Sequence, residues 1–479
     1  PPPAGAVPAA ATAPHARCSP LLHHPHHLPP PSPALPAAPR APRRPLSRGM
    51  PGTRPAPRRR SAAAAAAPHK AISVSSMFDG GNIEVLKVDQ ASGAMQLAIR
   101  PDPFCESDKA HHMMWFNYRV RGARGRALAM DIVNAGEASY PTAWDGYQVA
   151  ASYDLHKWFR VPTSYANGTL AVRHTPDADS VQYAFFAPYT THQHDAFIAR
   201  AQVSPLVTLE VLGQTPDGRD IELLRIGEMD AGVGAAAARA PGAAADDGGA
   251  GAHVPAPAAP HKLAVWLTHR QHPGETQAEY FAEGLIERLA AARGSHDAVA
   301  RALLARCVFY VMPNMCPDGS ARGHLRCNAR GRNLNREWRE PCAENSPEVF
   351  YTLKKMRETG VDFFMDVHGE EELPHVFVAG NQAIPRFGPR LQQLQDSFSD
   401  AFKRASPEFQ TKYGYPYAPA GKANLSLASK AVGQEFDCLA LTLEMPFKDS
   451  AELPEPVHGY TPDRCRGLGA AFLTALLEV

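Results

Sequence analysis

The chain has 479 residues, of which 44% are hydrophobic, and its formal net charge is +1. This length suffices for about two or three domains, and so neutral a balance gives no electrostatic reason to expect nucleic acid or a membrane surface as a partner. No apolar stretch reaches the roughly 20 residues that a membrane span needs.

The segment 1–77 is rich in Pro, Ala, Arg and His, and the first acidic residue of the chain is Asp79. Such a segment cannot bury enough apolar surface to offset its loss of conformational entropy, so we predict a disordered tail. The part that begins at Met50 is Arg-, Ala- and Ser-rich and resembles an organelle transit peptide. A disordered tail, an overextended gene model and a transit peptide for a plastid or mitochondrion all remain open.

Eight cysteines are scattered along the chain without a Cys-x-x-Cys pair. This distribution fits free thiols in a reducing compartment better than a disulfide framework. We therefore expect a cytoplasmic protein, or an organellar one if the first segment is a transit peptide.

Residues 78–188 contain short runs in which polar and apolar residues alternate, separated by turn sequences such as DGG, ASG and NAG. Alternation of this kind is typical of strands with one buried face. We predict an antiparallel β-sandwich domain for 78–188.

Residues 189–479 change to a pattern of apolar strands and amphipathic helices. The stretch HDAFIARAQ is expected to be helical, and residues 207–228 to form two strands around a Pro-Asp-Gly turn. The Ala-, Gly- and Pro-rich segment 229–260 is expected to be a surface insertion. Continuous apolar strands are expected at 262–269, 307–314, 361–368, 375–380 and 439–445, and helices at 276–292, 346–358, 387–404 and 463–477. The predicted fold is α/β, with a mixed, largely parallel sheet flanked by helices.

The sequence HPGE at 272–275 follows the first of these strands and precedes a helix. From this segment alone two interpretations stay open. His272 and Glu275 are metal ligands, or Pro-Gly forms a turn and the glutamate complements the dipole of the helix that follows.

A second histidine, His368, ends the strand 361–368. Its alternative role is that of a histidine hydrogen-bonded at the end of a strand. Open α/β sheets bind ligands beyond the carboxyl ends of their strands, where both histidines are expected. Two His and one Glu with an open fourth position form the ligand set of a catalytic zinc site.

The loop between these histidines is rich in arginine, which by itself indicates a solvated loop or a nucleic-acid contact. Asn335 and Arg336 are followed closely by Trp338, which favours a packed position. The planar fork of arginine can hold a carboxylate through two hydrogen bonds. Glu444 ends the apolar strand 439–445, where a carboxylate is costly unless it is used or paired, so it is a candidate general base.

Together these motifs resemble the zinc carboxypeptidases of the carboxypeptidase A superfamily. The residues that carry the resemblance are HPGE, His368 after an apolar strand, NLNREW at 333–338 and LTLEMPF at 441–447. The sequence PDG followed by GHLR at 317–326 is most similar to the cytosolic carboxypeptidases, which carry a β-sandwich ahead of the catalytic domain. The likeness spans roughly residues 78–479 and implies that 189–479 is the catalytic domain of a metallocarboxypeptidase.

The resemblance also implies a role for each site residue. His272, Glu275 and His368 would hold one zinc ion, Glu444 would be the base that activates water, and Arg326 would hold the oxyanion. Asn335 and Arg336 would bind the terminal carboxylate of a peptide or protein. The subfamily commonly removes glutamate from acidic tails, tubulin's among them, and Lys430 is the nearest basic candidate for such a pocket, although spacing alone favours a solvated lysine.

The chain also departs from the family pattern. Cys316 stands where Asn is common, and Asn333 where Asp is common. Classical members carry a substrate-contacting Tyr about twenty residues before the catalytic Glu, but residues 418–443 contain none. Tyr413, Tyr415 and Tyr417 are the candidates for that role, which is otherwise absent.

Two rival functions follow from the same residues. An acylamino-acid hydrolase of the aspartoacylase type shares much of the fold, but the β domain at 78–188 and the lack of a β domain after Glu444 argue against it. An inactive module that binds acidic peptides is the second rival, and the presence of all three ligands together with Glu444 argues against that.

Overall fold

The computed structural model describes residues 70–105, 111–228, 261–294 and 296–479. The insertion predicted at 229–260 and the tail or transit segment up to residue 69 lie outside the described residues. Strand β1 (Ser73–Ser75) pairs with β4 (Asn117–Arg121), so the β-rich region begins ahead of residue 78, where the alternating pattern placed its start. Three residues are too short a run for alternation to reveal a strand.

The β-rich region consists of two five-stranded sheets. The first has the order β1-β4-β10-β6-β7 and the second β2-β3-β5-β9-β8. The other strands of the first sheet are β10 (Ser180–Ala184), β6 (Val149–Ser152) and β7 (Phe159–Val161). Those of the second are β2 (Glu84–Val88), β3 (Ala94–Ala98), β5 (Leu128–Ile132), β9 (Thr169–His174) and β8 (Thr163–Ala166). The pairs are antiparallel except β3–β5, which is parallel, so the prediction of an antiparallel domain was wrong for that pair.

A seven-stranded mixed sheet forms the rest of the framework, in the order β11-β12-β14-β13-β15-β17-β16. Its four central strands run parallel, and they are β14 (Cys307–Met312), β13 (Leu263–His269), β15 (Phe363–Glu370) and β17 (Leu439–Pro446). The outer strands β11 (Val207–Gln214), β12 (Asp220–Ile226) and β16 (Phe377–Ala379) pair antiparallel. This arrangement confirms the predicted fold class.

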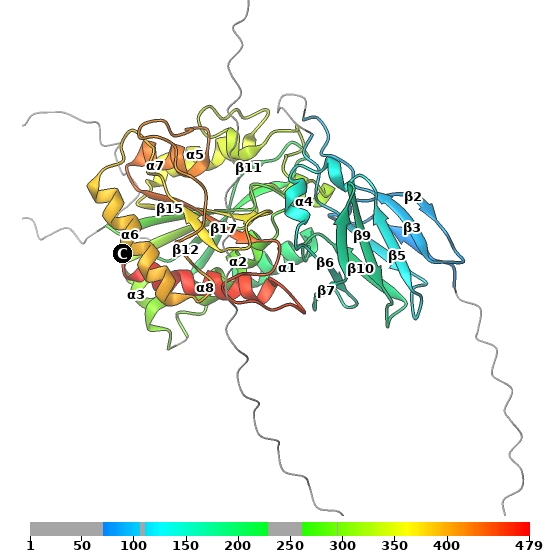
Figure 1. Cartoon of the computed structure of the whole chain (residues 1–479). Coiled ribbons are helices and arrows are strands. Elements are labelled where there is room, and N and C mark those ends of the chain that lie inside the picture. The colour runs from blue at the N-terminus through cyan, green and yellow to red at the C-terminus, as the bar shows by residue number, and fades with distance from the viewer. Residues whose placement is uncertain (1–69, 106–110, 229–260, 295) are drawn as a thin grey trace, which may run out of the picture. The chain divides into compact units, whose positions relative to one another are not determined.

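Helices cover both faces of this sheet (Figure 1). On one face lie α2 (Gln277–Ala290), α3 (Ala298–Arg306), α6 (Pro389–Ala405) and α8 (Pro462–Leu477). On the other lie α5 (Pro347–Thr359) and α7 (Ala428–Phe436). The remaining helices are α1 (Thr191–Ala201), α4 (Pro317–Arg322), and the short 3-10 helices η1 (Ala135–Glu137), η2 (Pro141–Trp144) and η3 (Leu334–Arg336). The sequence pattern did not predict α3, α4 or α7, which have six to nine residues each and give little periodic signal.

Burial explains why α2 forms where it does. Its apolar stripe of Phe281, Leu285 and Leu289 is fully buried. It packs against α8 so closely that a Cβ added to Gly284 would lie 2.1 Å from the carbonyl oxygen of Arg466. No helix in the described residues is long and apolar enough to cross a membrane.

The register of the central strands brings the predicted site residues to one edge. His368 on β15 pairs directly with Glu444 on β17, and His269, the last residue of β13, pairs with Val367. Because these strands are parallel, their carboxyl ends lie at the same edge of the sheet. The loop that follows β13 therefore begins beside His368.

Candidate active site

The loop between β13 and α2 carries His272 and Glu275, and a buried arginine fixes its path. Arg270 has a positive φ of 55°, which turns the chain sharply after β13. Its guanidinium donates to the carbonyl of Pro273 at 2.9 Å and to the Glu279 carboxylate at 2.6 Å. Gly274 leaves no room for a side chain, because a Cβ there would lie 2.9 Å from the carbonyl oxygen of Leu325.

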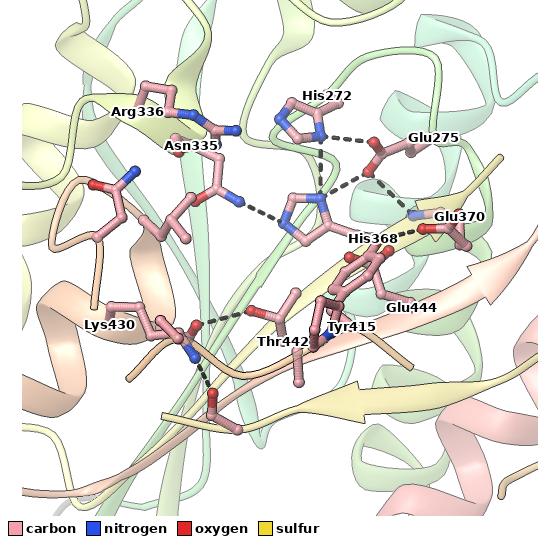
Figure 2. A pocket seen from close by; sticks show the side chains of 18 of the residues that line it. His272, Glu275, Asn335, Arg336, His368, Glu370, Tyr415, Lys430, Thr442 and Glu444 are labelled. Atoms are coloured by element: carbon pink, nitrogen blue, oxygen red, sulfur yellow. Dashed lines mark hydrogen bonds and ion pairs between the residues drawn. The ribbon is translucent and has the colours of Figure 1, made fainter. Parts of the chain in front are cut away.

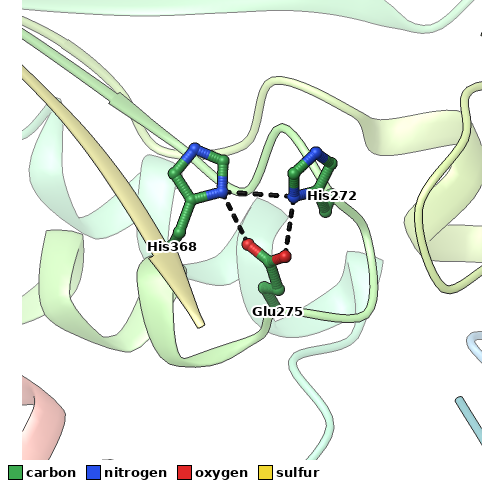
Figure 3. Close-up of side chains that lie close together, drawn as sticks. All are labelled: His272, Glu275 and His368. Atoms are coloured by element: carbon green, nitrogen blue, oxygen red, sulfur yellow. Dashed lines mark hydrogen bonds and ion pairs between the residues drawn. The ribbon is translucent and has the colours of Figure 1, made fainter. Parts of the chain in front are cut away.

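The three predicted metal ligands converge (Figure 3). Nδ1 of His272 lies 2.6 Å from one oxygen of Glu275, and Nδ1 of His368 lies 2.7 Å from the other. The two Nδ1 atoms are 3.2 Å apart. One ligand atom from each residue lies within 4.8 Å of the others, and all three residues are buried.

A second layer of side chains orients both imidazoles. Nε2 of His368 is 2.6 Å from the carboxylate of Asp366, which also accepts hydrogen bonds from Thr268 at 2.8 Å and Gln271 at 2.6 Å. Nε2 of His272 is 3.1 Å from the side-chain oxygen of Asn333. When each Nε2 donates to its acceptor, Nδ1 is free to bind a metal. Asn333, which departs from the family pattern, therefore still offers the acceptor oxygen that this position requires.

The charges at the site match a cation. Burial and the nearby charge of Arg326 lower the pKa of His272 to about 4, so its imidazole is neutral and can act as a ligand. Glu444 is buried, and its Oε2 accepts no hydrogen bond from the described residues. Burial raises the pKa of Glu444 well above its ordinary value, and the neighbouring carboxylates of Glu275, Glu370 and Glu371 add to this despite the opposing influence of His368. Such a surplus of buried carboxylates, beside two imidazole nitrogens and a carboxylate that converge, fits a divalent metal such as zinc.

A cavity of about 430 Å³ opens in front of these residues (Figure 2). All eight predicted site residues line it: His272, Glu275, Arg326, Asn335, Arg336, His368, Lys430 and Glu444. They come from β15, β17 and several loops, and include two residues of η3 and one of α7. Bringing together residues this far apart in the chain is what the tertiary structure adds to the motifs.

The two predicted carboxylate-binding residues sit beside His368. The side-chain oxygen of Asn335 accepts the N–H of Ala428 at 2.8 Å, and its Nδ2 lies 3.4 Å from Nε2 of His368. Arg336 is exposed, and its guanidinium donates to the carbonyl of Asn335 at 2.8 Å. Arg326 is largely buried, with Nη1 3.9 Å from Glu275.

Lys430 is partly buried in the cavity wall instead of solvated on a surface. Its ammonium donates to the carbonyl of Gly380. Burial lowers the pKa of Lys430 to about 8. Thr442 and Ser429, whose hydroxyls are 2.8 Å apart, line the cavity next to it.

Of the three candidate tyrosines, Tyr415 and Tyr417 line the cavity, whereas Tyr413 does not. The hydroxyl of Tyr415 donates to Glu370. Tyr413 instead stacks on His375, with ring centroids 4.3 Å apart.

Sequence reasoning missed several residues of the cavity. Tyr140, at the start of η2 in the β-rich region, lines it, and burial raises its pKa to about 12. No local pattern marks Tyr140, because it reaches the site only through packing. Glu370 and Glu371 come two and three residues after His368, and their position at the carboxyl end of an apolar strand was the available signal.

Comparison with known proteins agrees with this geometry. The zinc carboxypeptidase family model matches residues 197–464, and the model of the cytosolic carboxypeptidase N-terminal domain matches residues 74–186. Cytosolic carboxypeptidase 6 of Caenorhabditis elegans is 25% identical over 84% of this chain and 85% of its own length. The crystal structure of a metallo-carboxypeptidase from Burkholderia cenocepacia is 42% identical with a TM-score of 0.75, covering 85% of this chain and 98% of that one. A metallo-carboxypeptidase from Pseudomonas aeruginosa, solved in complex with (2-guanidinoethylmercapto)succinic acid, is 40% identical with a TM-score of 0.74 and the same coverage.

These matches confirm the family that the motifs indicated. The chain belongs to the zinc carboxypeptidase family, with the N-terminal domain of the cytosolic carboxypeptidases, and is a metallocarboxypeptidase, a metal-dependent hydrolase of peptides.

Proposed function

We propose that this metallocarboxypeptidase uses zinc to remove single residues from the C-termini of peptides or proteins, and that it prefers glutamate. The observation that carries the proposal is the convergence of His272, Glu275 and His368 beside Glu444 in one cavity. A zinc ion held by these residues would act as a Lewis acid and lower the pKa of water.

The side chains divide the work between them. Glu444 takes a proton from the attacking water and delivers it to the leaving amine, because its carboxyl group lines the cavity beside the ligand cluster and its Oε2 accepts no hydrogen bond from the described residues. Arg326 holds the oxygen of the scissile carbonyl as negative charge develops on it. Asp366 and Asn333 hold the two imidazoles in orientation.

The same cavity accounts for cleavage at chain ends. Asn335 and Arg336 lie on the side of His368 away from Glu275 (Figure 2), where they would bind the free carboxylate of the last residue. Only a C-terminal residue can offer that carboxylate while its own peptide bond reaches the ligand cluster. Arg336 provides the forked geometry that a carboxylate prefers.

One observation supports glutamate as the preferred residue. Lys430 is a cation in the cavity wall, where the side-chain carboxylate of a terminal glutamate can pair with it. We further propose acidic protein tails, such as tubulin's, as partners. We propose a cytoplasmic location, which the names of the relatives support.

The test is mass spectrometry of a panel of peptides that differ only in the last residue, carried out with the zinc-loaded enzyme. Loss of single C-terminal residues, fastest for glutamate, is expected. Glu444→Gln is expected to keep zinc and lose turnover by about 10²–10⁴-fold. Glu358→Gln, on α5 beside Lys355, serves as the matched control and should behave like the wild type.

Other results would contradict the proposal. Full activity in Glu444→Gln would mean that another group is the base. Hydrolysis of N-acyl-aspartate without release of C-terminal residues would favour the acylamino-acid hydrolase. Tight binding of acidic peptides without any turnover would favour the inactive binding module.

A further inference from the structure

The N-terminal β domain contacts the loop that carries Arg326 through one buried carboxylate. Asp102, which follows strand β3, is only 5% exposed. Its Oδ1 accepts the backbone N–H of Leu325 at 2.7 Å. Its Oδ2 accepts the N–H groups of Arg326 at 2.7 Å and Cys327 at 2.9 Å. A carboxylate that accepts successive backbone N–H groups fixes the path of that backbone more firmly than a neutral acceptor would.

The same backbone is held from the other side by the metal-ligand loop. The carbonyl of Leu325 accepts the N–H of Gly274 at 2.9 Å, within the HPGE sequence. The segment 325–327 therefore lies between Asp102 and the loop of His272 and Glu275. A shift of Asp102 would therefore move the backbone of Arg326, a residue that lines the cavity.

Close contacts on either side of the three hydrogen bonds keep the domain and the loop in register. Asn82 donates through Nδ2 to the carbonyl of Gly323 at 3.1 Å. A Cβ on Gly331 would lie 1.8 Å from the carbonyl oxygen of Phe104, so only glycine fits there, and its φ is +71°. Sequence-distant backbones that approach so closely leave the loop little freedom to move alone.

We infer that Asp102 is a positioning residue for catalysis, through which the N-terminal domain sets the position of the Arg326 guanidinium. This inference rests on the role proposed for Arg326. Asp102 touches no substrate; it acts by fixing the backbone from which Arg326 projects. The N-terminal domain is thus part of the catalytic machinery and not only a neighbour of it.

The test is a double-mutant cycle on the zinc-loaded full chain, with kcat and KM measured for a good peptide substrate. Asp102→Asn keeps the size of the side chain but presents an NH2 group to backbone donors. We expect kcat to fall roughly 10- to 100-fold, because a small displacement of the Arg326 guanidinium weakens its contact with the reacting carbonyl. KM should change much less. Arg326→Ala is expected to lower kcat about 10²–10³-fold.

The decisive measurement is the coupling between the effects of the Asp102 and Arg326 substitutions on kcat. A residue with a purely structural role would show no such coupling. In the Arg326→Ala background, Asp102→Asn should cost almost nothing further in kcat. The matched control is Asp79→Asn, since Asp79 also belongs to the β domain and accepts a backbone N–H, that of Thr191 at 2.5 Å, but does not contact the loop. It should leave kcat close to that of the wild type and be additive with Arg326→Ala.

Zinc content and thermal stability are measured for every variant. Should Asp102→Asn fail to fold, the same cycle is run with Asp102→Glu, which keeps the charge and moves it by one methylene. The inference would be overturned if the two single-variant losses in kcat multiplied in the double variant. It would also be overturned if Asp102→Asn kept the kcat of the wild type while Arg326→Ala lost most of it. If Arg326→Ala itself retains wild-type kcat, the proposed role of Arg326 fails and the inference falls with it.

Discussion

The preference for glutamate can be tested at a single side chain, Lys430. Lys430→Met keeps the length of the side chain and removes its charge. At an effective dielectric constant of about 20, two unit charges about 4 Å apart attract by roughly 4 kcal/mol. Part of this is offset, because the substrate carboxylate loses water and the ammonium already donates to Gly380. We expect a net loss of about 2–3 kcal/mol for glutamate, which is roughly 30- to 150-fold in kcat/KM.

The assay is competition between two peptides that end in glutamate and glutamine and are otherwise identical. The ratio of their kcat/KM values should collapse in Lys430→Met, because glutamine has the same shape and no charge. Lys422→Met removes an exposed lysine from the neighbouring loop that does not line the cavity, and it should leave the ratio unchanged. An unaltered ratio in Lys430→Met would mean that Lys430 does not select glutamate.

The same lysine gives the preference a pH dependence. Burial lowers the pKa of Lys430 to about 8 in the free enzyme, so the cation is present below that pH and is lost as the pH rises through it. The glutamate-to-glutamine ratio should therefore fall above pH 8, whereas the ratio in Lys430→Met should stay flat. A wild-type ratio that stays constant through this range would show that the charge of Lys430 does not select the substrate.

Three further predictions concern the metal and the packing of the fold. Removing zinc with a chelator should abolish peptide hydrolysis, and adding zinc back should restore it. Asn333→Ala removes the acceptor 3.1 Å from Nε2 of His272. It should weaken zinc binding about 10- to 100-fold, measured in competition with a chromophoric chelator. Unchanged zinc affinity would mean that Asn333 does not orient the imidazole. Gly284→Ala should lower the free energy of unfolding by about 1–3 kcal/mol in urea titrations, because its Cβ would meet the Arg466 carbonyl and force α2 and α8 apart. Gly467→Ala on α8 has open space around its Cβ and should not destabilise the protein; equal effects of the two substitutions would contradict this account.

The site could be predicted from sequence because its residues stand near the ends of apolar strands or in the loop that follows one. His368 and Glu444 each lie near the carboxyl end of an apolar strand, and the structure shows that these strands are parallel neighbours whose register pairs the two residues. HPGE alone remained ambiguous between a metal site and a helix start. What favoured the metal site was its combination with the other motifs, and the structure brings His272 and Glu275 to His368.

Lys430 shows where spacing is not enough. Its position fourteen residues before Glu444 does not indicate whether the lysine side chain is buried. The helix on which it lies, α7, was not predicted from the sequence. A lysine on a short helix is usually solvated. Here α7 packs against the sheet beside β17, which turns Lys430 into the cavity.

Local periodicity and short motifs in the chain were enough to predict the main strands, the longer helices, the family and the chemical identity of the candidate ligands. That Tyr140 of the β domain lines the cavity, and that Asp102 binds the backbone of the Arg326 loop, became visible in the folded chain alone. The reason is physical: such contacts depend on how closely packed loops meet across the interior, and single residues on irregular segments leave no periodic trace in the chain.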